Sequence, residues 1–260
     1  MAATLETSVW PSPGWRTAPS LDAAAEIGWN IRVRVLGEHA HCRQTNVAAL
    51  AAAAGAEIRE TDLASVAGGS EALLIPLPRN GFCIAVDPTP RGGWDNRDSS
   101  SRRDVCRQRI RFRVAHELGH TLFYQRTPGE LPWRNHCTSE LEEAFCDRFA
   151  RGLLIPDGAV RRCRRISGLL RIQHEHDVSL EVALRALAEV QGLYAALFHW
   201  PAKGGGPVVQ WSNVAARRRL ENWRSAVAAG ARHIPDALAL PAAEGALLAR
   251  RRQALVIASV

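Results

Sequence analysis

Long apolar runs are missing from this sequence. No stretch approaches the roughly 20 consecutive apolar residues that a membrane-spanning helix needs. Residues 1–30 also lack a basic leader followed by an apolar core, so they do not have the form of a secretory signal. We therefore expect a cytoplasmic protein without a membrane partner.

Paired cysteines are missing as well. Six cysteines are spread over 260 residues and none belongs to a CxxC pair. A chain of this length with so few cysteines is not a disulfide scaffold, and the thiols are expected to be reduced.

Recognised nucleic-acid-binding motifs are absent too, although the formal charge is +7 and is carried almost wholly by arginine. A net positive charge can favour binding to acidic partners. Without such a motif, however, a nucleic-acid partner is not favoured over a basic surface that simply faces solvent. The apolar share of 47% is that of a globular chain. The length allows one substantial core with an appendage or a second small domain.

The N-terminal half predicts a mixture of short strands and helices. Asn46 or Thr45 would cap an alanine-rich helix that Gly55 closes. Residues 72–77 and 82–86 predict a hairpin, and a long helix is expected over about 103–124.

Further helices are expected after this segment. One spans about 140–154 and stops at Pro156, because proline cannot continue the hydrogen-bond ladder. Another spans 178–190 with Ser179 as its cap. Residues 194–200 and 207–211 flank a Gly-rich turn and suggest a second hairpin, and 215–229 suggests an amphipathic helix. The fold class is therefore α+β.

The most informative segment is His116-Glu117-Leu118-Gly119-His120. Two histidines four apart on a helix project from one face, where both imidazoles can reach a single Zn²⁺. Glu117 follows the first histidine directly and is the candidate general base for a metal-activated water. Gly119 is unusual inside a helix, and a close approach by another backbone or by substrate would explain it.

A catalytic zinc needs a third protein ligand and an open position for water. Glu143 is the candidate ligand in the helix over 140–154, and Asp147, one turn later, could accept the free N–H of a ligand histidine. Glu140 and Glu142 are the rivals. Glu142 points about 100° away from Glu143, and neither rival has an acid four residues later.

These motifs resemble the ImmA/IrrE family of metallopeptidases, which belongs to the gluzincin group with thermolysin. The resemblance extends over about Val47 to Val190 and is most specific around Arg107–His120 and Glu143–Pro156. It implies a small N-terminal sheet packed on the active-site helix, with further helices after the second ligand helix. By this likeness His116, His120 and Glu143 are zinc ligands, Glu117 is the general base and Asp147 supports a ligand.

The sequence departs from the family pattern at three points. Cys146 replaces the usual alanine, Asp147 replaces the commoner asparagine, and Ile110-Arg111 is inserted before Phe112. The resemblance weakens at both ends. We therefore divide the chain into a tail or arm (1–28), a metallopeptidase domain (29–200) and an appendage of unknown role (201–260).

Two further residues are candidates for the cleft. Tyr124 lies one turn after His120, and His136 lies in the loop between the two ligand helices. His174 and His176 also look metal-like, but residues two apart on a helix face opposite ways.

The sequence therefore predicts a zinc-dependent peptidase that acts on a protein or peptide. The family resemblance suggests narrow, regulatory cleavage of a partner such as a helix-turn-helix repressor. Two alternatives stay open. One is a DNA- or protein-binding regulator with a non-catalytic zinc site, and the other is a pathway enzyme that hydrolyses a non-protein amide or a peptide precursor.

Overall fold

The protein is an α+β chain of two compact units, residues 1–156 and 157–260. The computed structural model describes residues 10–11, 13–63, 71–79, 81–88, 99–134, 138–163, 166–199, 205–213, 216, 223–225, 227–228, 238–240, 243–248 and 253–258. Among these residues, no helix is both long enough and apolar enough to cross a bilayer. The predicted fold class is confirmed, whereas the division at residues 28 and 200 stays a prediction.

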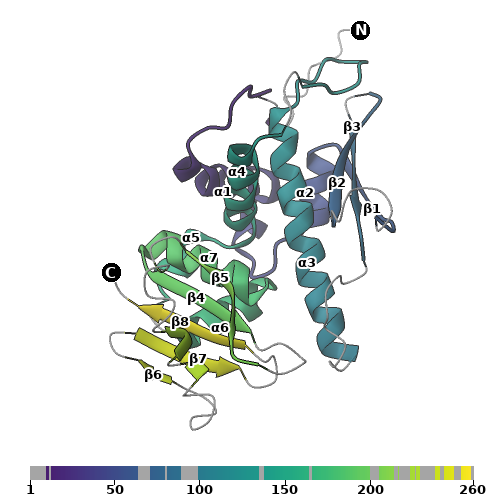
Figure 1. Ribbon diagram of the computed structural model, residues 1–260. Coiled ribbons are helices and arrows are strands. Elements are labelled where there is room, and N and C mark those ends of the chain that lie inside the picture. Colours follow the sequence, from purple (N-terminus) through teal and green to yellow (C-terminus); the bar gives the residue numbers. More distant parts are fainter. Residues whose placement is uncertain are drawn as a thin grey trace. The chain divides into compact units, whose positions relative to one another are not determined.

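A three-stranded sheet occupies one side of the first unit (Figure 1). Its order is β1 (Ala56–Glu60), β3 (Gly81–Val86), β2 (Ala72–Leu77), with β1 parallel and β2 antiparallel to β3. The predicted hairpin is therefore confirmed. Helix α3 (Ser99–His120) packs against β2 and β3, as expected for a small sheet on the active-site helix.

Local capping explains where the predicted helices begin. In α2 (Val47–Ala53) the Asn46 side chain accepts a hydrogen bond from the Ala49 N–H, and Gly55 follows with φ +66°. Helix α4 (Glu140–Leu154) has the predicted bounds, with Ser139 as its cap.

Helix α3 is shorter at its C-terminal end than predicted. It ends at His120, and Thr121–Phe123 form a 3₁₀ turn, η2, before Tyr124 becomes extended. The Thr121 hydroxyl donates to the Leu118 carbonyl at 2.7 Å, which helps to tighten the chain there.

Helix α1 (Leu21–Leu36) was not predicted, and its first eight residues fall in the segment expected to be a tail or arm. It lies beside α4 because Gly152 allows close contact: a Cβ there would be 2.0 Å from the Ala25 carbonyl oxygen. Buried Arg32 donates to the carbonyls of Leu153 and Leu154, which ends α4 with satisfied acceptors. A short 3₁₀ helix, η1 (Gly37–His41), follows α1.

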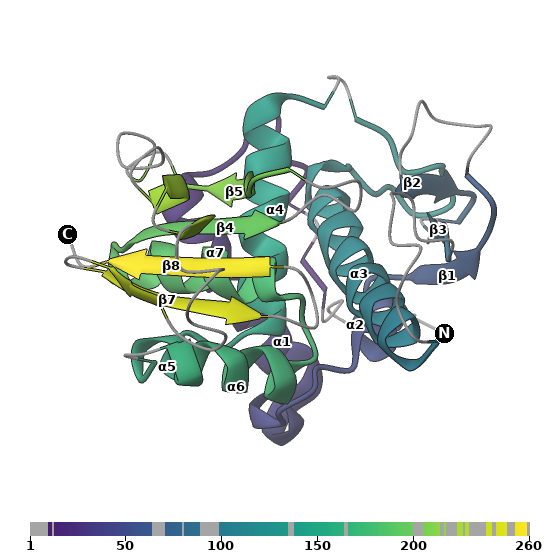
Figure 2. The same cartoon turned by 60° about the horizontal axis from the view of Figure 1, so that its bottom comes forward.

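In its described residues, the second unit combines helices with an antiparallel sheet of five strands (Figure 2). The helices are α5 (Asp157–Arg161), α6 (Ile166–His176) and α7 (Leu180–Gln191). The sheet order is β5 (Val208–Ser212), β4 (Tyr194–His199), β8 (Gln253–Ala258), β7 (Ala243–Leu248), β6 (Leu238–Leu240).

Helix α7 packs on β4, and α6 on β7. The Ser179 cap of α7 and the β4–β5 pairing are confirmed, while β6–β8 were not predicted. Most of the helix predicted over 215–229 lies outside the described residues.

Candidate metal centre

Helix α3 carries the two histidines and Glu117 on one face, which borders the cavity described below. Its opposite face is anchored by Val114, Ala115 and Leu118, all at most 1% exposed. This apolar anchorage fixes the rotation of the helix about its axis, and His116, Glu117 and His120 are themselves buried.

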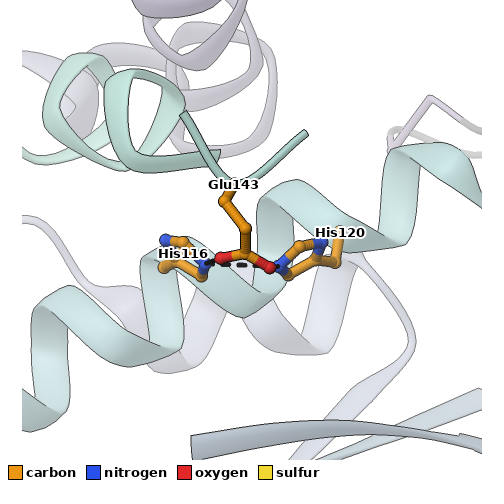
Figure 3. A group of neighbouring side chains, drawn as sticks. All are labelled: His116, His120 and Glu143. Carbon is orange, nitrogen blue, oxygen red and sulfur yellow. Dashed lines mark hydrogen bonds and ion pairs between the residues drawn. The ribbon is translucent and has the colours of Figure 1, made fainter. Parts of the chain in front are cut away.

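Helix α4 places Glu143 over the two rings (Figure 3). Glu143 Oε2 lies 3.1 Å from His116 Nε2, and Oε1 lies 3.4 Å from His120 Nε2. The two Nε2 atoms are 3.2 Å apart. In the described part of the chain, these three residues form the one group of histidine, cysteine and acidic side chains with the geometry to hold a metal ion.

The remaining nitrogen of each ring contacts a carboxylate on α4. His116 Nδ1 lies 3.0 Å from Asp147 Oδ1, and His120 Nδ1 lies 2.6 Å from Glu142 Oε1. An ionised carboxylate can only accept, so each Nδ1 carries a proton, and each Nε2, once deprotonated, would offer its lone pair to a cation. The structure therefore places Asp147 where the sequence predicted it and adds Glu142.

Gly119 allows α3 and α4 to approach closely. A Cβ at this position would lie 3.2 Å from the Cα of Cys146 and 3.1 Å from Cδ1 of Phe149. The expected approach of another backbone is confirmed, and it is what brings Glu143 within reach of α3.

The hydrogen bonds around the rings favour protonation of both histidines. Burial, the largest single effect on the pKa of His116, disfavours the imidazolium, but the bonds to Asp147 and Glu143 outweigh it and raise that pKa. At His120, burial is again outweighed, by bonding to Cys146 and the glutamates, and the pKa rises to about 12. In the absence of metal, the cluster therefore holds protons that a cation would displace.

The two carboxyl groups of the site are shifted in opposite directions. Hydrogen bonds from His116 and His120 hold the pKa of Glu143 well below its ordinary range. Burial raises the pKa of Glu117, against the opposing charge of the two histidines. Glu143 is thus favoured as an anion that binds a cation, and Glu117 as a group that can take up and return a proton.

A cavity of about 540 Å³ opens beside the cluster. Its walls include Glu117, the strand β2 through Ala72–Leu74, and Tyr124. The predicted cleft position of Tyr124 is therefore found, although the ring also packs edge-on against Phe82 at 5.2 Å. His136 lies outside the described residues.

In β2, every second residue points its backbone N–H and C=O groups away from β3. Pro76 lacks an N–H and stands opposite Phe82, whose own N–H donates to Gly55 on the far side of β3. Opposite residues of an antiparallel pair alternate between exchanging both hydrogen bonds and exchanging none. The N–H and C=O groups of Ala72 and Leu74 therefore point to an edge that no other described strand occupies.

Sequence reasoning treated Glu142 as a rejected ligand and missed its contact with His120. Glu142 also accepts a hydrogen bond from Arg134 Nη1 at 2.7 Å. Its position directly before Glu143 gave no sufficient signal, because a 100° offset on one helix does not say which side faces another helix.

The histidines of α6 do not form a second site among the described residues. His176 is buried and His174 is exposed, as their spacing predicted.

Comparison with known families matches residues 103–188 to the IrrE N-terminal-like domain of the M78 peptidases. The match runs from α3 through most of α7 and includes all three clustered residues. A comparison with curated proteins gives no match.

Proposed function

We propose that this chain, a member of the ImmA/IrrE metallopeptidase family through residues 103–188, is a zinc-dependent cytoplasmic peptidase of narrow specificity. The convergence of two imidazole nitrogens and one carboxylate beside an open cavity carries the proposal.

Zinc is a metal that this donor set fits. Tetrahedral bonds of 2.0–2.1 Å require donors separated by about 3.3 Å. The observed separations are 3.1, 3.2 and 3.4 Å. His116, His120 and Glu143 would hold the ion and leave one position open. When bound, zinc would supply a Lewis acid that lowers the pKa of water and polarises the scissile carbonyl.

Glu117 is the residue that moves the proton. It lines the cavity beside the ligands without belonging to their cluster, and burial raises its pKa. Its carboxylate takes a proton from the attacking water as the water oxygen bonds to the carbonyl carbon. When the C–N bond breaks, Glu117 returns that proton to the departing nitrogen.

The edge of β2 supports an extended peptide as the substrate. Ala72 and Leu74 offer two N–H donors and two C=O acceptors beside the cavity, the groups with which an added strand pairs. This pattern suits a backbone amide better than a compact non-peptide amide. By the family likeness, a helix-turn-helix repressor is the first candidate substrate.

Three arginines of α3 give no support to the DNA-binding alternative. Arg109 and Arg113 of α3 both pair with Glu71, and Arg107 pairs with Asp104. These arginines are engaged with acids of the chain itself. Among the described cysteines, Cys42, Cys83, Cys106 and Cys146 are free thiols, which supports a reducing compartment.

The proposal is tested by metal analysis and cleavage assays on the wild type and Glu117→Gln, each incubated with candidate repressors from the same genome. Both proteins should bind one zinc, and the variant should lose cleavage by at least about a hundredfold. The exposed Glu140→Gln is the matched control and should cleave normally. Equal cleavage by Glu117→Gln would refute the mechanism, and a zinc-loaded wild type that binds repressor without cleaving it would favour the regulator.

A further inference from the structure

We propose that Glu142 is a positioning residue that fixes the ring and tautomer of His120 for metal binding, with Arg134 as its counter-charge. The inference rests on the metal site of the proposed function and adds a residue to it.

Glu142 is placed for this role by contacts on two sides. It is 1% exposed, and its Oε1 lies 2.6 Å from His120 Nδ1 and 2.7 Å from Arg134 Nη1. A carboxylate so buried is unfavourable unless it is hydrogen-bonded and paired with a cation. Both conditions are met here, because His120 supplies the hydrogen bond and Arg134 supplies the cation.

The counter-charge must come from arginine once a metal is bound. His120 as a ligand is neutral, so it offers Glu142 a hydrogen bond but no charge. Arginine carries a permanent positive charge, and the Arg134 guanidinium is held at 5.2 Å over the Tyr124 ring and by Thr138. Arg134 Nη1 and His120 Nδ1 contact the same oxygen, Glu142 Oε1, so this one carboxylate links the arginine to the imidazole ring and holds the ring in place.

A comparison with the other histidine sharpens the inference. Asp147 contacts His116 in the same way, but its side chain is 32% exposed, against 1% for Glu142. Water can replace the Asp147 oxygen after substitution, whereas the enclosed position of Glu142 leaves no such replacement. Substitution at Glu142 should therefore weaken metal binding more than the matched substitution at Asp147.

The experiment compares two variants of similar length, Glu142→Gln and Glu142→Met, with Glu140→Gln as the exposed control. Zinc affinity is measured by competition with a chromophoric chelator, without a peptidase assay. The His120 Nδ1 proton is followed by NMR in the zinc-loaded protein, and circular dichroism reports folding.

Glu142→Met should lower zinc affinity by about ten- to a hundredfold and lose the protected Nδ1 proton resonance. Glu142→Gln should lower zinc affinity less, because the amide oxygen still accepts a hydrogen bond. The His120 Nδ1 proton resonance of this variant should move upfield. Asp147→Asn should change affinity less than Glu142→Gln, and Glu140→Gln should not change it.

Wild-type affinity in folded Glu142→Met would overturn the inference while leaving the metal site intact. If Glu142→Met does not fold, Glu142→Gln decides, and an unshifted Nδ1 resonance there would overturn the inference. Failure of the wild type itself to bind zinc would instead refute the proposed metal site.

Discussion

A Cβ atom on Gly119 would lie 3.0 Å from the Sγ atom of Cys146, so the two ligand helices touch where a side chain would separate them. Glycine in a helix interior costs about 0.8–1 kcal/mol relative to alanine. This loss of helix stability is offset by the close packing of α3 on α4, which brings Glu143 to the histidines.

Gly119→Ala is expected to weaken zinc binding although alanine favours the helix. The added methyl would push against Cys146 and Phe149 and move α4 away from α3, since overpacking costs about 1–3 kcal/mol. Calorimetric titration with zinc measures the change. Adding Cys146→Ala removes the nearest atom and should restore part of the affinity, and unchanged binding in the single variant would contradict the packing argument.

Gly152→Ala should lower the free energy of unfolding of the first unit more than Gly119→Ala does. The new Cβ would lie 2.0 Å from the Ala25 carbonyl oxygen, so α1 must shift on α4, at about 1–3 kcal/mol or more. Urea unfolding measures the loss. Gly158→Ala, whose Cβ would meet only the flexible end of Arg162, is the control and should be neutral or slightly stabilising.

Zinc binding should tighten as the pH rises. The pKa values of His116 and His120 are raised in the metal-free protein, so protons occupy the nitrogens that the ion requires. Because the ion must displace these protons, a lower proton concentration favours binding, so the affinity rises with pH. Titrations between about pH 6 and 8, in buffers of different ionisation enthalpy, should also detect proton release. An affinity independent of pH would argue against both imidazoles as ligands.

Leu74→Pro should raise the KM for an extended peptide substrate. Proline removes the N–H that points to the open edge of β2, and the β2–β3 ladder does not use that group. Loss of one backbone hydrogen bond predicts about a three- to tenfold effect. Leu74→Ala keeps the N–H and controls for the side chain, so an equal effect in both variants would place the contact in the side chain.

Local signals in the sequence were sufficient to place the ligand helices and part of the site. Pro156 predicts the C-terminal end of α4, and the separation of four residues predicts that His116 and His120 share a face. The structure brings Glu143 and Asp147 to these rings as the sequence predicted, whereas their roles as ligand and support remain to be tested.

The features that were missed depend on tertiary contacts. Helix α1 is held by its packing on α4 and by Arg32, neither of which leaves a strong periodic pattern in its own residues. Strand β1 is short and largely polar, and its pairing with β3 identifies it. The contact of Glu142 with His120 depends on how close α3 and α4 lie, which spacing within α4 alone does not report.

Pro76 has a consequence for the behaviour of the protein at high concentration. A strand with an open edge is a template on which further copies can add and grow into fibrils. Because Pro76 withholds a donor two residues beyond Leu74, the open edge accepts only a short ladder. The protein can thus keep a few amide groups open to a guest chain while resisting self-aggregation through the same strand.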